Sequence, residues 1–152
     1  MTAWKFKRIL FAEDSENDVE LTLEALDEYK LANSVDVVQD GEEALDYLLR
    51  RGKYKDRPDE NPVVILLDLK MPKLDGLDVL KKIKEHEKLK NIPVVILTSS
   101  KLEEDIIRSY NLGANGYVVK PVDFIEFVEA IKKIGAYWVL SNEPPPLSKF
   151  MK

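Results

Sequence analysis

Residues 63–76 read Val-Val-Ile-Leu-Leu-Asp-Leu-Lys-Met-Pro-Lys-Leu-Asp-Gly. The apolar run at 63–67 has the length and composition of a strand that is covered on both faces. Asp68 follows this run directly, and the apolar residues at 79, 80 and 83 then recur with helical spacing. A buried strand that ends in a carboxylate and leads into a helix is typical of open α/β sheets.

The same pattern repeats along the chain. Further short apolar runs lie at residues 9–12, 35–38, 94–97 and 117–119. Stretches with helical spacing lie between and after them, at residues 19–26, 44–49, 79–83, 106–110 and 124–138. This alternation predicts a doubly wound, five-stranded parallel sheet with right-handed crossovers and helices on both faces. Ligands bind such sheets at the carboxyl ends of the strands.

Length and composition bound the domain organisation. The chain has 152 residues, 45% of them hydrophobic and 34% charged, which is a globular balance. We expect one domain over residues 1–140, with a polar loop inserted at 51–62 and an extended last helix. The proline-containing residues 141–152 are expected to form a C-terminal extension.

The bulk properties also exclude some functions. A net charge of -5 disfavours nucleic acid and anionic membrane surfaces as partners. The absence of cysteine excludes disulfides, thiolate metal sites and cysteine nucleophiles. No apolar stretch reaches the roughly 18 residues that a membrane span needs, so we expect a cytoplasmic protein.

Polar side chains follow four of the apolar runs. They are Glu13 and Asp14, then Asp68, then Thr98 to Ser100, then Lys120. Two carboxylates about 4 Å apart repel by about 4 kcal/mol at an effective dielectric of 20, so three of them at one sheet edge need a cation or a shifted protonation state. Oxygen ligands without histidine or thiolate favour Mg²⁺.

Taken singly, each of these residues has an ordinary explanation. An acid at a strand end is usually a helix cap or a solvated loop residue. Three acids, a hydroxyl and a lysine at converging strand ends favour a reaction centre instead. An aspartate carboxylate can attack phosphorus, a lysine and a metal ion can neutralise the phosphoryl oxygens, and a threonine can donate to one of them.

Residues 68–76, with a proline four positions after Asp68 and Asp75-Gly76 before the next helix, resemble the phosphoacceptor segment of the response-regulator receiver family. The resemblance extends from residue 7 to about 138 and implies a CheY-like, flavodoxin-like fold with strand order 2-1-3-4-5. The interval from Asp14 to Asp68 is slightly long for the family, and we assign the excess to the loop at 51–62.

The resemblance implies a role for each residue of the predicted site. Asp68 would be the phosphoacceptor, with Asp14, Asp68 and the Lys70 backbone carbonyl as direct Mg²⁺ ligands and Glu13 as a ligand through water. Lys120 would pair with the phosphoryl oxygens, and the Lys120–Pro121 bond would be cis.

The resemblance also implies a switch. On phosphorylation Thr98 would move toward the new oxygens and Tyr117 would turn into the space it leaves, which changes the fourth helix. Lys70 and Ser100, at the mouth of the site, would tune the rates of phosphorylation and hydrolysis.

The expected partners follow from the same resemblance. The phosphodonor histidine would belong to a sensor histidine kinase, because His86 is expected to be a solvated surface residue. No output module is seen after residue 140, so a stand-alone receiver is expected. The loop at 51–62 and the extension at 136–146 resemble a subgroup partnered to phytochrome-type photoreceptor kinases. The aromatic last helix, from Phe124 to Leu140, suggests a homodimer face.

Two other classes use a similar framework. A haloacid-dehalogenase-type phosphohydrolase needs a second acid two residues after its nucleophile, where this chain has Lys70. A flavodoxin-type FMN binder needs a donor-rich phosphate loop after the first strand, where Glu13 and Asp14 would repel the phosphate. Both are disfavoured, and we expect a phosphoacceptor signalling protein rather than an enzyme acting on other substrates.

Overall fold

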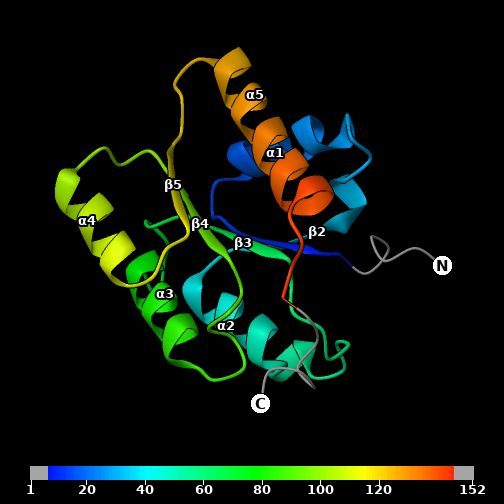
Figure 1. Cartoon of the computed structure of the whole chain (residues 1–152), viewed down its shortest axis with the longest axis vertical. Coiled ribbons are helices and arrows are strands. Elements are labelled where there is room, and N and C mark those ends of the chain that lie inside the picture. Colours follow the sequence, from blue (N-terminus) through cyan, green and yellow to red (C-terminus); the bar gives the residue numbers. More distant parts are fainter. Residues whose placement is uncertain (1–6, 146–152) are drawn as a thin grey trace.

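The computed structural model describes residues 7–145 (Figure 1). Five parallel strands form one sheet in the order β2-β1-β3-β4-β5, which confirms the predicted topology. The strands are β1 (Ile9–Ala12), β2 (Val35–Val38), β3 (Val64–Leu67), β4 (Val94–Thr98) and β5 (Gly116–Val119). Each strand lies within one residue of an apolar run in the sequence. The runs of β1, β3 and β4 are continuous because these strands are buried on both faces.

The crossovers between the strands are helical. The α-helices are α1 (Glu16–Asp27), α2 (Gly41–Leu49), α3 (Gly76–Glu85), α4 (Glu103–Asn111) and α5 (Phe124–Gly135). A π-helical segment, Ala136–Ser141, continues α5 without a break. Short 3₁₀ turns lie at Ala32–Ser34 and Gly52–Tyr54. None of the helices in residues 7–145 has both the length and the apolar character that a membrane crossing requires.

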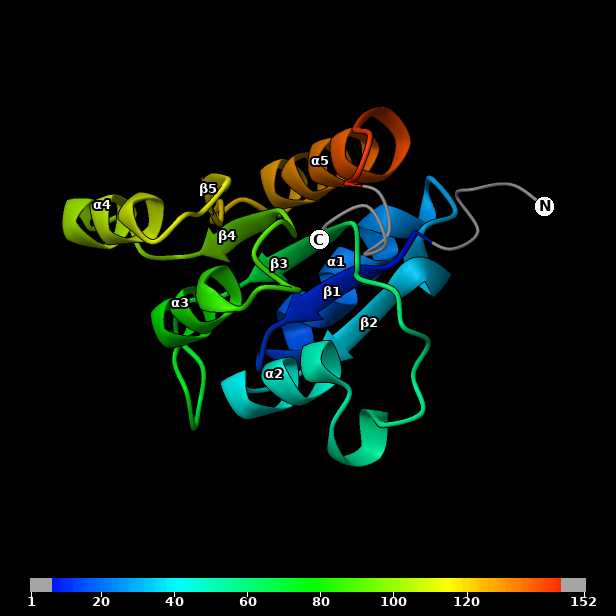
Figure 2. The ribbon, with the colours of Figure 1, turned by 60° about the horizontal axis from the view of Figure 1, so that its bottom comes forward.

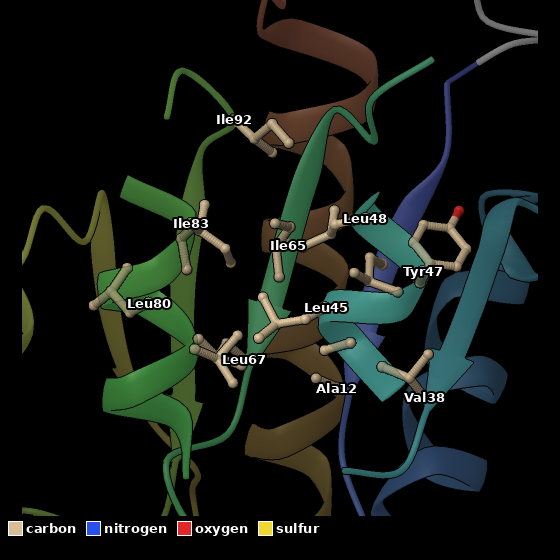
Figure 3. Close-up of a cluster of buried hydrophobic side chains, with 14 of the residues drawn as sticks. Ala12, Val38, Leu45, Tyr47, Leu48, Ile65, Leu67, Leu80, Ile83 and Ile92 are labelled. Carbon is tan, nitrogen blue, oxygen red and sulfur yellow. The ribbon is translucent and has the colours of Figure 1, made fainter. Parts of the chain in front are cut away.

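The helices cover both faces of the sheet. Figure 2 shows α5 on one side and α2 and α3 on the other, and α1 packs beside α5. The core on the α2 and α3 side includes Leu45 and Leu48 from α2 and Leu80 and Ile83 from α3 (Figure 3). The opposite core is formed by β-strand residues together with Leu26, Phe127 and Ile131, among others.

Helix α4 is anchored less firmly than the others. Helices α1, α2, α3 and α5 each begin with a Ser or Asp side chain that accepts a hydrogen bond from a backbone amide of the first turn. The N-cap residue of α4, Leu102, forms no such side-chain bond, and the buried residues of the helix are the polar Asp105 and Ser109. It lies at the edge of the molecule, beside β5 and α3 (Figure 1).

Arg57 is one of the residues that attach the loop at 51–62 to the rest of the fold. The guanidinium of Arg57 lies 4.1 Å from the centre of the Tyr47 ring, and its Nε donates to the Tyr47 carbonyl at 2.9 Å. The same guanidinium donates to the carbonyl of Glu60 at 2.8 Å. The Tyr47 hydroxyl in turn donates to Asp36 on the edge strand β2, at 2.5 Å. The inserted loop is therefore joined to α2 and to the edge of the sheet.

Candidate phosphoacceptor site

Strand pairing brings the polar strand ends together at one edge of the sheet. The Asp68 amide donates to the Ala12 carbonyl at 3.1 Å, which extends the pairing of β1 and β3 by one residue. In the same way the Lys120 amide donates to the Thr98 carbonyl at 2.7 Å, beyond the pairing of β4 and β5. The residues that the sequence placed at strand ends are neighbours for this reason.

Three carboxylates form the centre of the site. One oxygen each of Glu13, Asp14 and Asp68 lies within 4.8 Å of the other two. Glu13 and Asp68 are buried, with 1% and 6% of their surface exposed, whereas Asp14 is exposed. Hard divalent cations prefer oxygen ligands of this kind, and the exposed Asp14 gives access from solvent. The residues therefore fit a divalent cation.

The ammonium of Lys120 lies inside the same cluster. Its Nζ contacts Glu13 Oε1 at 2.5 Å and Asp18 Oδ2 at 2.8 Å, and lies 3.7 Å from Asp68 Oδ2. Burial lowers the pKa of Lys120, but the hydrogen bonds to Asp18 and Glu13 outweigh burial and raise it. The lysine is therefore a fixed positive charge beside Asp68.

Glu13 has the most perturbed carboxyl group of the site. Burial, reinforced by the negative charge of Asp68, raises the pKa of Glu13 to about 7, although the contact with Lys120 acts in the opposite direction. A cation bound to the three carboxylates would favour the ionised form. Proton and metal binding at this edge of the sheet are consequently linked.

The predicted switch residues lie on the side of the site nearest α4. Thr98 is completely buried at the end of β4. The Tyr117 hydroxyl donates to the Ser100 carbonyl at 3.1 Å, and the Ser100 hydroxyl donates to Asp105 Oδ2 at 2.6 Å. Burial raises the pKa of Tyr117, so the phenol keeps its proton. A chain of two hydrogen bonds thus joins β5, the loop after β4 and helix α4.

The backbone around Asp68 is packed against the start of α3. A Cβ atom at Gly76 would lie 2.3 Å from the Asp68 carbonyl oxygen, so this position requires glycine. The Gly76 amide also donates to the Leu69 carbonyl at 2.9 Å. The Asp75-Gly76 pair therefore fixes the segment that carries Asp68 as well as beginning the helix.

A cavity of about 400 Å³ opens beside the acidic cluster. Its walls come from Asp14, from the loop after β3, from the first turn of α3 and from α4: Asp14, Leu69, Lys70, Met71, Pro72, Asp75, Leu77, Asp105 and Arg108. Lys70 is exposed at this opening.

The structure adds to the predicted set and corrects one detail. Asp18, in the first turn of α1, and Asp105, in α4, contact site residues but were missed from the sequence, where both read as ordinary acids near helix N-termini. Residues 7–145 contain no cis peptide bond, so Lys120–Pro121 is trans and not cis as the resemblance implied. Trans is the form that X–Pro bonds ordinarily prefer, by about 0.5–1 kcal/mol.

A parallel sheet in the order 2-1-3-4-5 that gathers three acids, a lysine and a buried threonine at its carboxyl edge defines a class of phosphoacceptor signalling domain. The model of the response regulator receiver domain matches residues 9–132. The chain belongs to this family and is a phosphoacceptor protein of two-component signalling, not a conventional enzyme.

Several individual response regulators are similar to this chain over most of its length. The response regulator Rcp1 of Synechocystis sp. is 38% identical over 133 residues, 88% of this chain and 89% of Rcp1. The phosphorylated cyanobacterial phytochrome response regulator RcpA has a TM-score of 0.86 at 38% identity, covering 92% of this chain and 99% of RcpA. The bacteriophytochrome response regulator RtBRR is 53% identical with a TM-score of 0.73, covering 96% of this chain and 88% of RtBRR.

A metal-bound relative bears on the acidic cluster. The Mn²⁺-bound form of Rcp1 has a TM-score of 0.86 at 37% identity, covering 92% of this chain and 99% of Rcp1. Its metal is a divalent cation, the class that Glu13, Asp14 and Asp68 suit by their oxygen ligands.

Proposed function

We propose that Asp68 accepts a phosphoryl group from a phosphohistidine of a sensor kinase and that the resulting acyl phosphate switches the surface around α4. The observation that carries the proposal is the position of Asp68, buried between two other carboxylates and 3.7 Å from Lys120. One Asp68 oxygen forms the new bond to phosphorus, and the donor imidazole leaves with the electron pair of the P–N bond.

The residues divide the work of this transfer. We assign Asp14, Asp68 and the Lys70 carbonyl as direct ligands of Mg²⁺, with Glu13 as a ligand through water. The bound Mg²⁺ would neutralise charge on the transferred phosphoryl group. Lys120 would pair with a phosphoryl oxygen, and Thr98 would donate to another.

The switch that we propose uses the contacts beside α4. Once Thr98 donates to the phosphoryl group, its former position is open to the Tyr117 ring. Tyr117 already bonds the Ser100 carbonyl, and Ser100 bonds Asp105. A change at Thr98 therefore reaches the first turn of α4, and phosphorylation biases one of two packings of this helix.

The test is the intact mass of the protein after incubation with acetyl phosphate, with Mg²⁺ and with chelator. We expect one added phosphoryl group that requires Mg²⁺ and is lost in Asp68→Asn. Asp78→Asn is the matched control, because Asp78 is an exposed acid in the first turn of α3. An adduct that persists in Asp68→Asn, or that forms equally in chelator, would show that the assignment is wrong.

We also propose that the phosphoryl donor is a phytochrome-type histidine kinase. Support comes from RcpA and RtBRR, both phytochrome response regulators, the second at 53% identity. The test compares initial rates of phosphoryl transfer from several autophosphorylated kinases. A phytochrome-type kinase should be at least tenfold faster than the others, and equal rates would contradict the proposal. A cytoplasmic location remains a prediction.

We further propose a homodimer through the last helix. Tyr137 and Leu140, 53% and 56% exposed, place apolar surface beyond the core, whereas Phe127 and Ile131 of the same helix are buried in it. Sedimentation velocity should detect a dimer that Leu140→Ser weakens. Leu102→Ser is the control, because Leu102 is also 56% exposed but precedes α4. A monomer with and without phosphorylation would refute the dimer.

A further inference from the structure

Asp18 is a carboxylate of the site for which the transfer described above has no role. It lies in the first turn of α1, and its side chain is 25% exposed. Its Oδ2 accepts a hydrogen bond from Lys120 Nζ at 2.8 Å across a sequence separation of 102 residues. A surface ion pair between long side chains is ordinarily loose, but here the lysine side chain is only 10% exposed.

A side chain at the position of Asp18 often accepts a hydrogen bond from the N-cap amide of its helix, but in this protein Glu13 does so. Three positions after an N-cap serine or threonine, a glutamate or glutamine side chain commonly turns back to accept the N-cap amide. In this structure the Ser15 amide donates instead to Glu13 Oε2 at 3.2 Å, while the Ser15 hydroxyl accepts from the Asp18 amide at 3.3 Å. Glu13 thus accepts the N-cap amide, and the Asp18 carboxylate accepts from Lys120.

The ammonium group of Lys120 has three N–H donors. Two of them are used in the short contacts to Glu13 and Asp18, at 2.5 and 2.8 Å. Asp68 Oδ2, at 3.7 Å, is beyond hydrogen-bond distance. The lysine is thus held close to Asp68 without occupying the oxygen that must attack phosphorus, and it has one donor left.

We propose that Asp18 is a positioning residue that holds Lys120 away from the Asp68 nucleophile and reserves its third N–H for the incoming phosphoryl group. The proposal rests on the phosphoacceptor role of Asp68. In Asp18→Asn the ammonium loses one charged partner and moves onto Asp68. Each transfer must then first break that new ion pair, which slows the reaction at saturating donor.

The kinetics of Asp18→Asn distinguish an effect on the position of Lys120 from an effect on the binding of the phosphodonor. Asp18→Asn removes one negative charge from a pocket that receives an anionic donor, so the KM for acetyl phosphate should not rise. The maximal rate of adduct formation should fall about tenfold, the factor that corresponds to the loss of one charge-assisted contact. Asp18→Glu keeps the carboxylate and should recover most of the rate. Glu16→Gln, the same change of charge in the same helical turn, should match the wild type.

A spectroscopic measurement tests the position of Lys120 independently of phosphorylation. In ¹H–¹⁵N spectra of lysine ammonium groups, the slowly exchanging signal that disappears in Lys120→Met should be lost or shifted in Asp18→Asn and kept in Glu16→Gln. Absence of such a signal in the wild type would show that Lys120 is not held and would overturn the inference.

The two proposals fail in different ways. If the wild type forms no Asp68-dependent adduct, the phosphoacceptor assignment fails. If the wild type forms the adduct and Asp18→Asn forms it within twofold of the rate of Glu16→Gln, only the role of Asp18 is refuted. A tenfold slower Asp18→Asn with an unchanged ammonium signal would also refute it, because the effect would not pass through Lys120.

Discussion

Lys120→Met should make the stability of the fold depend on a divalent cation. The ammonium is the positive partner of three carboxylates, at 2.5 Å (Glu13), 2.8 Å (Asp18) and 3.7 Å (Asp68). At an effective dielectric of 20, each contact corresponds to about 4 to 7 kcal/mol of attraction before desolvation is subtracted. Removal of the lysine leaves the carboxylates of Glu13 and Asp68 buried without the ammonium group that lay beside them.

The net loss is much smaller than the sum of these attractions. The ammonium no longer has to be desolvated, and Glu13, whose pKa is already about 7, can take up a proton. Removing one partner of a buried ion pair typically costs 3–5 kcal/mol. We therefore expect the free energy of unfolding of Lys120→Met to fall by about 3 kcal/mol at pH 7.5 in the presence of chelator.

The assay is urea denaturation followed by far-UV circular dichroism, in chelator and in Mg²⁺. Because Lys120 repels a cation bound to Glu13 and Asp68, two carboxylates that it also contacts, Mg²⁺ should stabilise the variant by at least about 1 kcal/mol more than the wild type. Lys90→Met is the control, since Lys90 is exposed and pairs with the exposed Glu87. Equal losses of stability in Lys120→Met and Lys90→Met would show that Lys120 does not compensate the buried carboxylates. The same conclusion would follow if Mg²⁺ stabilised Lys120→Met no more than the wild type.

Further perturbations test other parts of the structure. Burial raises the pKa of Glu13 from 4.5 to about 7, so between these pH values the folded state binds more protons than the unfolded state. In chelator, the free energy of unfolding should therefore fall by up to about 3 kcal/mol as the pH rises through this window. Glu13→Gln should make the free energy of unfolding less dependent on pH in the same window. Gly76→Ala places a Cβ 2.3 Å from the Asp68 carbonyl and should cost about 2 kcal/mol in urea denaturation; wild-type stability would contradict the close packing. Tyr47→Phe removes the donor to Asp36 and should lower the melting temperature by an amount equivalent to about 1.5–3 kcal/mol; an unchanged value would show that this bond contributes nothing.

The sheet could be predicted from the sequence because its strands are short apolar runs that end in polar residues. Asp68 and Thr98 are the clearest cases: each directly follows or ends a buried strand, and parallel pairing alone brings them to one edge. The alternation of strand and helix predicts parallel strands with right-handed crossovers, whereas the order 2-1-3-4-5 came from the resemblance to the receiver family. The acidic cluster of Glu13, Asp14 and Asp68 follows from the same rule.

The contacts made by helix and loop side chains could not be predicted from the sequence pattern. Whether Asp18 faces Lys120 depends on the rotation of α1 about its axis, which is set by packing against α5 and the sheet. Likewise Arg57 appeared in the sequence only as part of a polar loop, although its guanidinium lies on the Tyr47 ring. The roles of the individual residues in phosphoryl transfer stay predictions until the experiments above are done.

The weak attachment of α4 has a consequence for the dynamics of the domain. A helix without a side-chain cap, whose buried residues are Asp105 and Ser109, loses little buried apolar surface when it opens. Its amide hydrogens should therefore exchange with solvent through local unfolding, at a lower free energy than those of the strands. A signal that has to remodel this helix works against a small opening free energy, so the modest energy of a few hydrogen bonds around one phosphoryl group is sufficient to shift it.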